Sequence, residues 1–148
     1  MPHIWPQVSE ILLGALLLVV STMVHGFGMY LVQQQFDRYW PTSPAARARR
    51  QFVFGSLILL MLCTHLVEVL LWAITLVLTD AVQDFRDAFY YSSVTYTTLG
   101  YEDIVLPHNW RLLAPMIAMS GVFAFGWTTG VIVNLVAQSR ASTRKESR

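Results

Sequence analysis

The chain has 148 residues, of which 55% are hydrophobic and 13% are charged, and its formal net charge is +1. A soluble domain has about 25% charged residues, so this composition argues against a soluble enzyme and favours a membrane protein. The small net charge also argues against a nucleic-acid-binding protein. Cys63 is the single cysteine, which excludes an intrachain disulfide and a cysteine-cluster metal site.

Three segments are long and apolar enough to cross a membrane. Residues 11–36 and 112–139 contain no Asp, Glu, Lys or Arg, and residues 51–79 are interrupted only by His65 and Glu68. An α-helix needs about 20 residues to cross a hydrocarbon core about 30 Å thick. We therefore predict transmembrane helices at residues 8–35, 51–79 and 111–138.

A fourth uncharged run, residues 88–101, is shorter. Lengths of about 10–14 residues are typical of re-entrant segments rather than spans. The run is rich in β-branched and aromatic residues, but an unpaired strand would leave its backbone hydrogen-bonding groups unsatisfied in lipid. The pattern therefore indicates a half-helix that enters and leaves the membrane on one side, packed within protein.

The basic residues indicate how the chain is oriented. Most of them lie in the loop between the first two spans and in the C-terminal tail, and three spans place both groups on one side of the membrane. By the positive-inside rule that side is the cytoplasm, so we expect the N-terminus and the re-entrant segment to face outward from the inner (plasma) membrane. The basic residues concerned are Arg38, Arg47, Arg49, Arg50, Arg140, Arg144, Lys145 and Arg148.

The re-entrant segment carries the motif on which the functional interpretation depends. Residues 97–103 read Thr-Thr-Leu-Gly-Tyr-Glu-Asp. This motif, lying between two full spans on the outward side, closely resembles the selectivity filter T-T-V-G-Y-G-D of tetrameric pore-loop potassium channels. The chain is similar to small bacterial members of that family, with an extra N-terminal transmembrane helix.

The resemblance implies a fold class, an assembly and an ion site. The fold would be all-α, with three transmembrane helices, a pore helix and a filter loop, and four chains would form a homotetrameric pore in the lipid bilayer. Backbone carbonyls of Thr98, Leu99, Gly100 and Tyr101 would coordinate K⁺. Apart from the transported cations, no cofactor and no organic substrate is expected.

The same resemblance divides the chain into parts. We expect an N-terminal transmembrane helix (1–36), a basic cytoplasmic loop (37–50), a pore domain (51–138) and a basic cytoplasmic tail (139–148). Within the pore domain we expect an outer helix at 51–79, a pore helix and filter at 86–103, and an inner helix at 111–138.

Glu102 is the departure from the family pattern, which has glycine at this position. A side chain forced into the left-handed region costs roughly 1–2 kcal/mol per chain. Four Glu102 and four Asp103 carboxylates would also surround the outer mouth, where they could concentrate cations or hold a divalent ion. Three functions therefore stay open: a passive potassium channel, a non-selective or divalent-binding cation channel governed by the acidic ring, and a non-conducting channel-like scaffold or sensor.

His65 and Glu68 lie three residues apart on one face of the second span. An ionisable group at membrane depth is costly and indicates a functional site. One hypothesis is a proton- or metal-sensing site that gates the pore, together with His25 of the first span. The alternative is a structural hydrogen-bond network that ties the outer helix to the pore helix. Its candidate partners are Tyr90, Ser92 and Ser93.

The third span contains Gly121, Gly126 and Gly130. The last two form a G-x-x-x-G pattern, which is typical of close helix packing. The family resemblance suggests instead that one of the three glycines is a gating hinge.

The sequence contains no recognisable catalytic motif. There is no G-x-S-x-G, no H-E-x-x-H and no phosphate-binding glycine loop. We therefore expect a channel rather than an enzyme.

Overall fold

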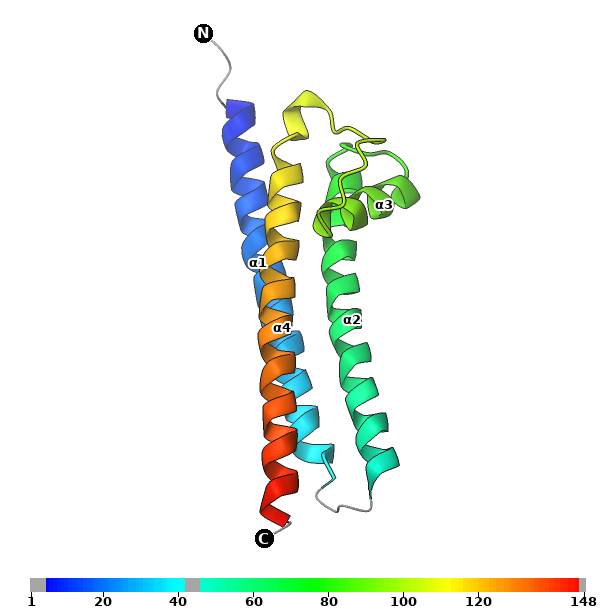
Figure 1. Cartoon of the computed structure of the whole chain (residues 1–148). Coiled ribbons are helices and arrows are strands. Elements are labelled where there is room, and N and C mark those ends of the chain that lie inside the picture. Colours follow the sequence, from blue (N-terminus) through cyan, green and yellow to red (C-terminus); the bar gives the residue numbers. More distant parts are fainter. Residues whose placement is uncertain (1–4, 42–45, 147–148) are drawn as a thin grey trace.

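In the computed structural model, which describes residues 5–41 and 46–146, the chain is all-α. Three long helices, α1 (Trp5–Tyr39), α2 (Arg47–Leu78) and α4 (Leu113–Glu146), accompany the short helix α3 (Phe85–Tyr96) and a 3₁₀ turn at His108–Trp110. α1 and α4 run in the same direction and α2 runs in the opposite one, while α3 lies across the end of α2 (Figure 1). The three long helices are candidate membrane spans and α3 fits a pore helix. The predicted fold class is therefore confirmed.

The long helices extend beyond the predicted spans at the end opposite α3. α1 continues to Tyr39, α2 begins at Arg47 and α4 continues to Glu146, so parts of the expected loop and tail are helical. Ala, Arg and Lys are strong helix formers, which explains why the helices do not stop where the apolar sequence stops. With 35 residues, α1 is about 50 Å long, well above a hydrocarbon core of about 30 Å.

α1 packs along both α2 and α4, which contact each other less. The approach to α2 is close, because a Cβ at Gly28 would overlap the side chain of Thr64. At the other end of α1 the buried Glu10 accepts a hydrogen bond from the backbone N–H of Leu112, beside the first turn of α4. Helix N-termini leave such N–H groups unsatisfied, so α1 also caps α4. The extra helix is an integral part of the packing.

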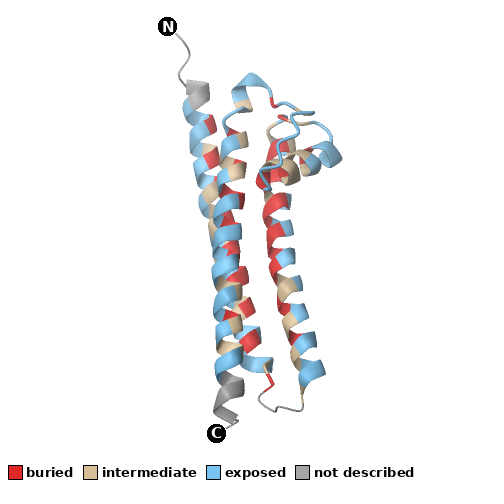
Figure 2. Ribbon diagram, in the orientation of Figure 1, coloured by how far each residue is buried: buried red, intermediate tan, exposed pale blue. Residues whose placement is uncertain are grey.

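The core consists of two apolar clusters with a polar layer between them. Figure 2 shows the buried residues on the faces that the long helices turn toward one another. The cluster near α3 includes Trp72, Leu76, Ala88, Leu113 and Ile117. The cluster near the far end includes Met29, Phe36, Leu57, Met61 and Leu135. Along α1, α2 and α4 alike, the polar residues of the site described below fall between these two clusters.

A tight reversal between α2 and α3 places the pore helix. Asp80 adopts a φ of 53°, and the two amides that follow it return to the carbonyl of Leu76 at 3.0 and 3.2 Å. A left-handed residue with returning amides is a common helix C-cap. The carboxylate of Asp84 then accepts from two backbone N–H groups in the first turn of α3, at 2.8 and 3.1 Å. This N-cap starts α3 immediately after α2 has ended.

Candidate functional site

Residues 97–103 leave the C-terminal end of α3 as a loop whose start is tied to the helix. The amide of Thr98 donates to the carbonyl of Thr95, and the amide of Leu99 donates to the carbonyl of Val94, each at 2.9 Å. All seven residues of the loop are exposed in the single chain. Because the C-terminal end of a helix carries a partial negative charge, α3 directs that charge at the start of the loop.

The backbone of this loop alternates in handedness. φ is 60° at Thr98, 59° at Gly100 and 60° at Glu102, and the two residues between them have negative φ. Alternating left- and right-handed residues turn successive peptide groups so that their N–H groups face one side and their carbonyl oxygens the other. Thr98 and Glu102 hold a conformation that is uncommon outside glycine, and such strain is concentrated at functional sites.

The last two residues of the loop are acidic. Glu102 and Asp103 are both exposed. The Tyr90 hydroxyl donates a hydrogen bond to Asp103, which raises the pKa of Tyr90 above its usual value. Behind the loop lies a cavity of about 460 Å³, whose lining includes both carboxylates and Arg111. The cavity lining therefore combines two acidic residues with one basic residue just before α4.

A buried polar network joins the three spans to α3. Nδ1 of His25 lies 2.7 Å from one oxygen of Glu68, and the Tyr96 hydroxyl donates to the other oxygen at 2.6 Å. Nδ1 of His65 lies 2.9 Å from the Tyr96 hydroxyl. Nε2 of His65 and Nε2 of His25 lie 3.0 and 3.3 Å from the Thr128 hydroxyl. These contacts close a ring of five buried side chains from four helices.

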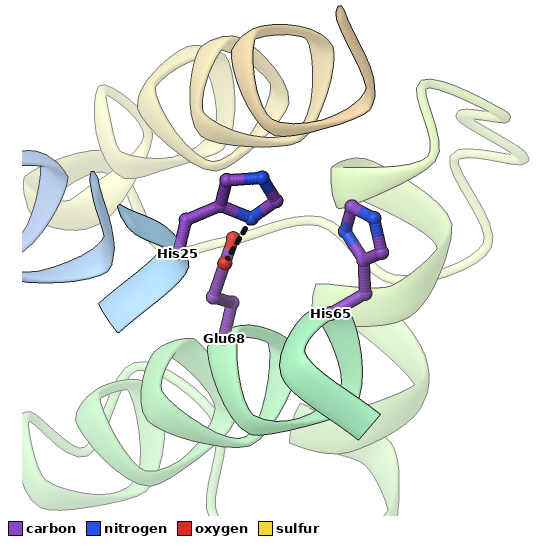
Figure 3. A group of neighbouring side chains, drawn as sticks. All are labelled: His25, His65 and Glu68. Atoms are coloured by element: carbon purple, nitrogen blue, oxygen red, sulfur yellow. Dashed lines mark hydrogen bonds and ion pairs between the residues drawn. The ribbon is translucent and has the colours of Figure 1, made fainter. Parts of the chain in front are cut away.

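The ring unites the three residues that the sequence singled out. His25, His65 and Glu68 come from α1 and α2 into one space, where a ligand atom of each lies within 4.8 Å of the others (Figure 3). The sequence separates His25 from Glu68 by more than 40 residues, so only the packing of α1 on α2 brings them together. The contact between them is an ion pair when His25 is protonated.

The expected link from this site to the pore helix was assigned to the wrong residues. Tyr96, the last residue of α3, reaches Glu68 and His65, and none of the three candidates does. Tyr90 interacts with Asp103 instead. The Ser93 hydroxyl donates to the carbonyl of Phe89 in the same helix at 2.7 Å. The buried Ser92 hydroxyl has no hydrogen-bond partner among the described residues. The physical reason is that the C-terminal end of α3, where Tyr96 lies, is the part of α3 nearest to the polar layer.

The main chain of Tyr96 is also held, by α4. A Cβ at Gly121 would overlap the carbonyl oxygen of Tyr96, so α4 and the end of α3 make backbone contact there. At Gly126 and Gly130, by contrast, a Cβ would have no described atom within 4 Å apart from the neighbouring residues and backbone of its own helix. Within the single chain, close packing therefore occurs at Gly121 and not at the G-x-x-x-G pair, and packing of that pair against another chain stays a prediction. A hinge at any of the three stays a prediction.

Three residues that make these buried contacts were not singled out by the sequence: Tyr96, Thr128 and Glu10. Thr128 lies seven residues after Gly121 and therefore on the same face of α4, but only the structure shows that this face contacts α3. Glu10 and Leu112 lie at the ends of two parallel spans, which puts them at one level of the membrane. For Tyr96 no signal in the sequence distinguishes it from its aromatic neighbours.

The arrangement of two long helices, a short re-entrant helix and an exposed loop agrees with the comparison with known families. The ion channel family matches residues 52–138, which include α2, α3, the loop and most of α4. No curated protein and no solved structure gives a significant match to the chain. The members of the matched family are ion channels, not enzymes. Since the match covers more than half of the chain, the protein belongs to the ion channel family.

Proposed function

We propose that the chain is a passive, potassium-conducting channel whose selectivity filter is formed by Thr98, Leu99, Gly100 and Tyr101. The observation that carries the proposal is the alternation of φ along residues 98–102, which suits a row of carbonyl oxygens on one side of the backbone. A potassium ion entering such a row exchanges its hydration shell for these oxygens. The C-terminal end of α3 adds a partial negative charge that favours a cation.

The proposed assembly is a homotetramer. One loop cannot surround an ion, so several copies must contribute loops to one axis, and cyclic symmetry closes such an arrangement. The single chain leaves the loop and one apolar face of α4 exposed, as an unassembled pore subunit would. The exposed apolar residues of that face include Met119, Val122, Phe123 and Val133.

The proposed orientation has the filter and the N-terminus outside and the C-terminus in the cytoplasm. Figure 1 shows the start of α1 and the loop after α3 at one end of the molecule and the end of α4 at the other. Arg47, Arg49 and Arg50 begin α2 at that other end, and Arg140 lies near the end of α4. This distribution supports an inner-membrane protein oriented by the positive-inside rule.

A second candidate function is a non-selective or divalent-binding cation channel. It is favoured by the exposure of Glu102 and Asp103 at the mouth and by the left-handed backbone at Glu102, where the family has glycine. Four copies of these carboxylates would form a ring of high negative potential. In that case the acidic ring, and not the carbonyl row, would determine which ions pass.

Flux measurements on purified protein in liposomes separate these functions. The liposomes carry potassium, sodium or calcium gradients, and native mass spectrometry establishes that the protein is tetrameric. Potassium flux well above sodium flux supports the carbonyl row, and comparable flux of all three cations supports the acidic ring. Absence of flux from tetrameric protein would refute both and leave a channel-like scaffold or sensor. Protein-free liposomes provide the background.

A further inference from the structure

Four side chains of the buried ring, from three helices, bring possible metal-ligand atoms close together. Nδ1 of His25 and the hydroxyl of Tyr96 lie 2.7 and 2.6 Å from the two oxygens of Glu68. Nδ1 of His65 lies 2.9 Å from the same hydroxyl. Two imidazole nitrogens and a carboxylate are a common ligand set for zinc, and the phenol supplies a fourth oxygen. All four side chains are buried, so no bulk water competes for these atoms.

The spacing of these atoms fits one metal ion after a small movement. Tetrahedral zinc with bonds of about 2.0–2.1 Å keeps neighbouring ligand atoms about 3.3 Å apart. The ligand atoms of His25, His65 and Glu68 lie within 4.8 Å of one another. Shifts on the order of 1 Å, within the reach of side-chain rotation, bring all of them to bonding distance.

Thr128 orients the imidazole rings of His25 and His65 for metal binding. Its hydroxyl contacts Nε2 of His65 at 3.0 Å and Nε2 of His25 at 3.3 Å, which leaves both Nδ1 atoms directed toward Glu68 and Tyr96. Histidines that bind metals commonly use their second nitrogen in a hydrogen bond that fixes the ring. One threonine of α4 performs this function for both rings.

We propose that one transition-metal ion of the Zn²⁺ class binds between α1, α2 and α3 through His25, His65, Glu68 and Tyr96. The charges of the Glu68 carboxylate and a Tyr96 phenolate balance the two charges of the ion, so the occupied site is neutral, as its place within the spans requires. Binding releases the hydroxyl proton of Tyr96 and any proton shared by His25 and Glu68.

The bound ion would connect the extra helix to the filter. α1 contributes one ligand, α2 two, and the fourth belongs to the residue that immediately precedes the filter loop. Metal binding therefore holds α1 against the C-terminal end of α3. Zn²⁺ binding at this site does not depend on potassium conduction. A negative result in the flux experiment therefore leaves the binding experiment unaffected, and the reverse also holds.

The test is zinc binding to the full-length protein in nanodiscs after removal of metals with a chelator. Competition with a fluorescent zinc indicator gives affinity and stoichiometry, and one Zn²⁺ per chain is expected. His25→Ala and Glu68→Gln should each weaken binding more than 100-fold, because each removes a ligand. The matched control His108→Ala removes an exposed imidazole of the outer loop and should bind like the wild type. Glu102→Gln controls for binding at the acidic mouth and should also bind like the wild type.

Two further measurements keep the proposal falsifiable if a ligand variant does not fold. Thr128→Val leaves all four ligands in place and should weaken zinc binding about 10–100-fold through loss of ring orientation. Co²⁺ added to the wild type should give the intense visible absorption of a tetrahedral site. Absence of binding to the wild type, equal affinity in His25→Ala, or the weak absorption of octahedral Co²⁺ would each overturn the proposal.

Discussion

Replacing Glu102 by glycine removes backbone strain and a charge at the same time. The residue has a φ of 60°, where a side chain costs roughly 1–2 kcal/mol. Glycine also makes the unfolded chain more flexible, which opposes the gain by about 0.4–1 kcal/mol. We therefore expect Glu102→Gly to exceed Glu102→Ala in free energy of unfolding by about 1 kcal/mol per chain, since alanine retains the strain. That difference is roughly a fivefold change in the folding equilibrium constant.

Denaturant titration in mixed micelles, followed by tryptophan fluorescence, measures this difference. Glu102→Gln is the control for charge, because it keeps the size and the strain of the side chain. If charge at the mouth governs selectivity, Glu102→Gln and Glu102→Gly should change the ratio of potassium to sodium flux alike. If backbone strain at residue 102 governs selectivity, only Glu102→Gly should change this ratio. An alanine variant as stable as the glycine variant would refute the left-handed backbone at residue 102.

Three other perturbations test the contacts that hold the pore helix. Gly121→Ala should lower the free energy of unfolding by about 1–3 kcal/mol, because its Cβ overlaps the carbonyl of Tyr96, whereas Gly126→Ala should not destabilise the chain; both are measured by thermal unfolding. Tyr96→Phe should cost about 1–3 kcal/mol, since it removes the nearer donor to a buried oxygen of Glu68 and leaves that oxygen only the Ser21 hydroxyl at 3.4 Å. Hydrogen exchange at the end of α3 should rise. Asp84→Ala should cost about 0.5–2 kcal/mol through loss of the α3 N-cap, and Asp84→Asn, which keeps an acceptor, should restore most of it. Equal effects of the two variants at residue 84, or of the two glycine substitutions, would contradict these contacts.

Much of the fold could be predicted because the membrane imposes strong constraints on sequence. Charge-free runs longer than 20 residues have few alternatives to a spanning helix, and a shorter run between them has few alternatives to a re-entrant one. The ends of the helices were less predictable. Outside the hydrocarbon, the helix is limited by backbone propensity and capping instead of hydropathy, which is why α4 continues through the basic residues to Glu146.

Three of the five residues of the buried ring were predictable, but their connections and the other two residues were not. His65 and Glu68 were recognisable because ionisable groups are rare at that depth, and their spacing of three residues places them on one helical face. His25 reaches Glu68 only because of the angle at which α1 crosses α2. Side-chain packing along the whole interface determines that angle.

The sequence by itself therefore determined the three long apolar helices and the short helix between the last two of them, because each rests on local composition. Only the tertiary structure decided that Tyr96 rather than its neighbours enters the polar layer, that Thr128 orients both histidines, and that Gly121 meets the end of α3. These contacts join residues more than 20 positions apart, and their partners are selected by the angle and depth at which a short helix packs among three long ones. No local pattern of residues encodes that angle.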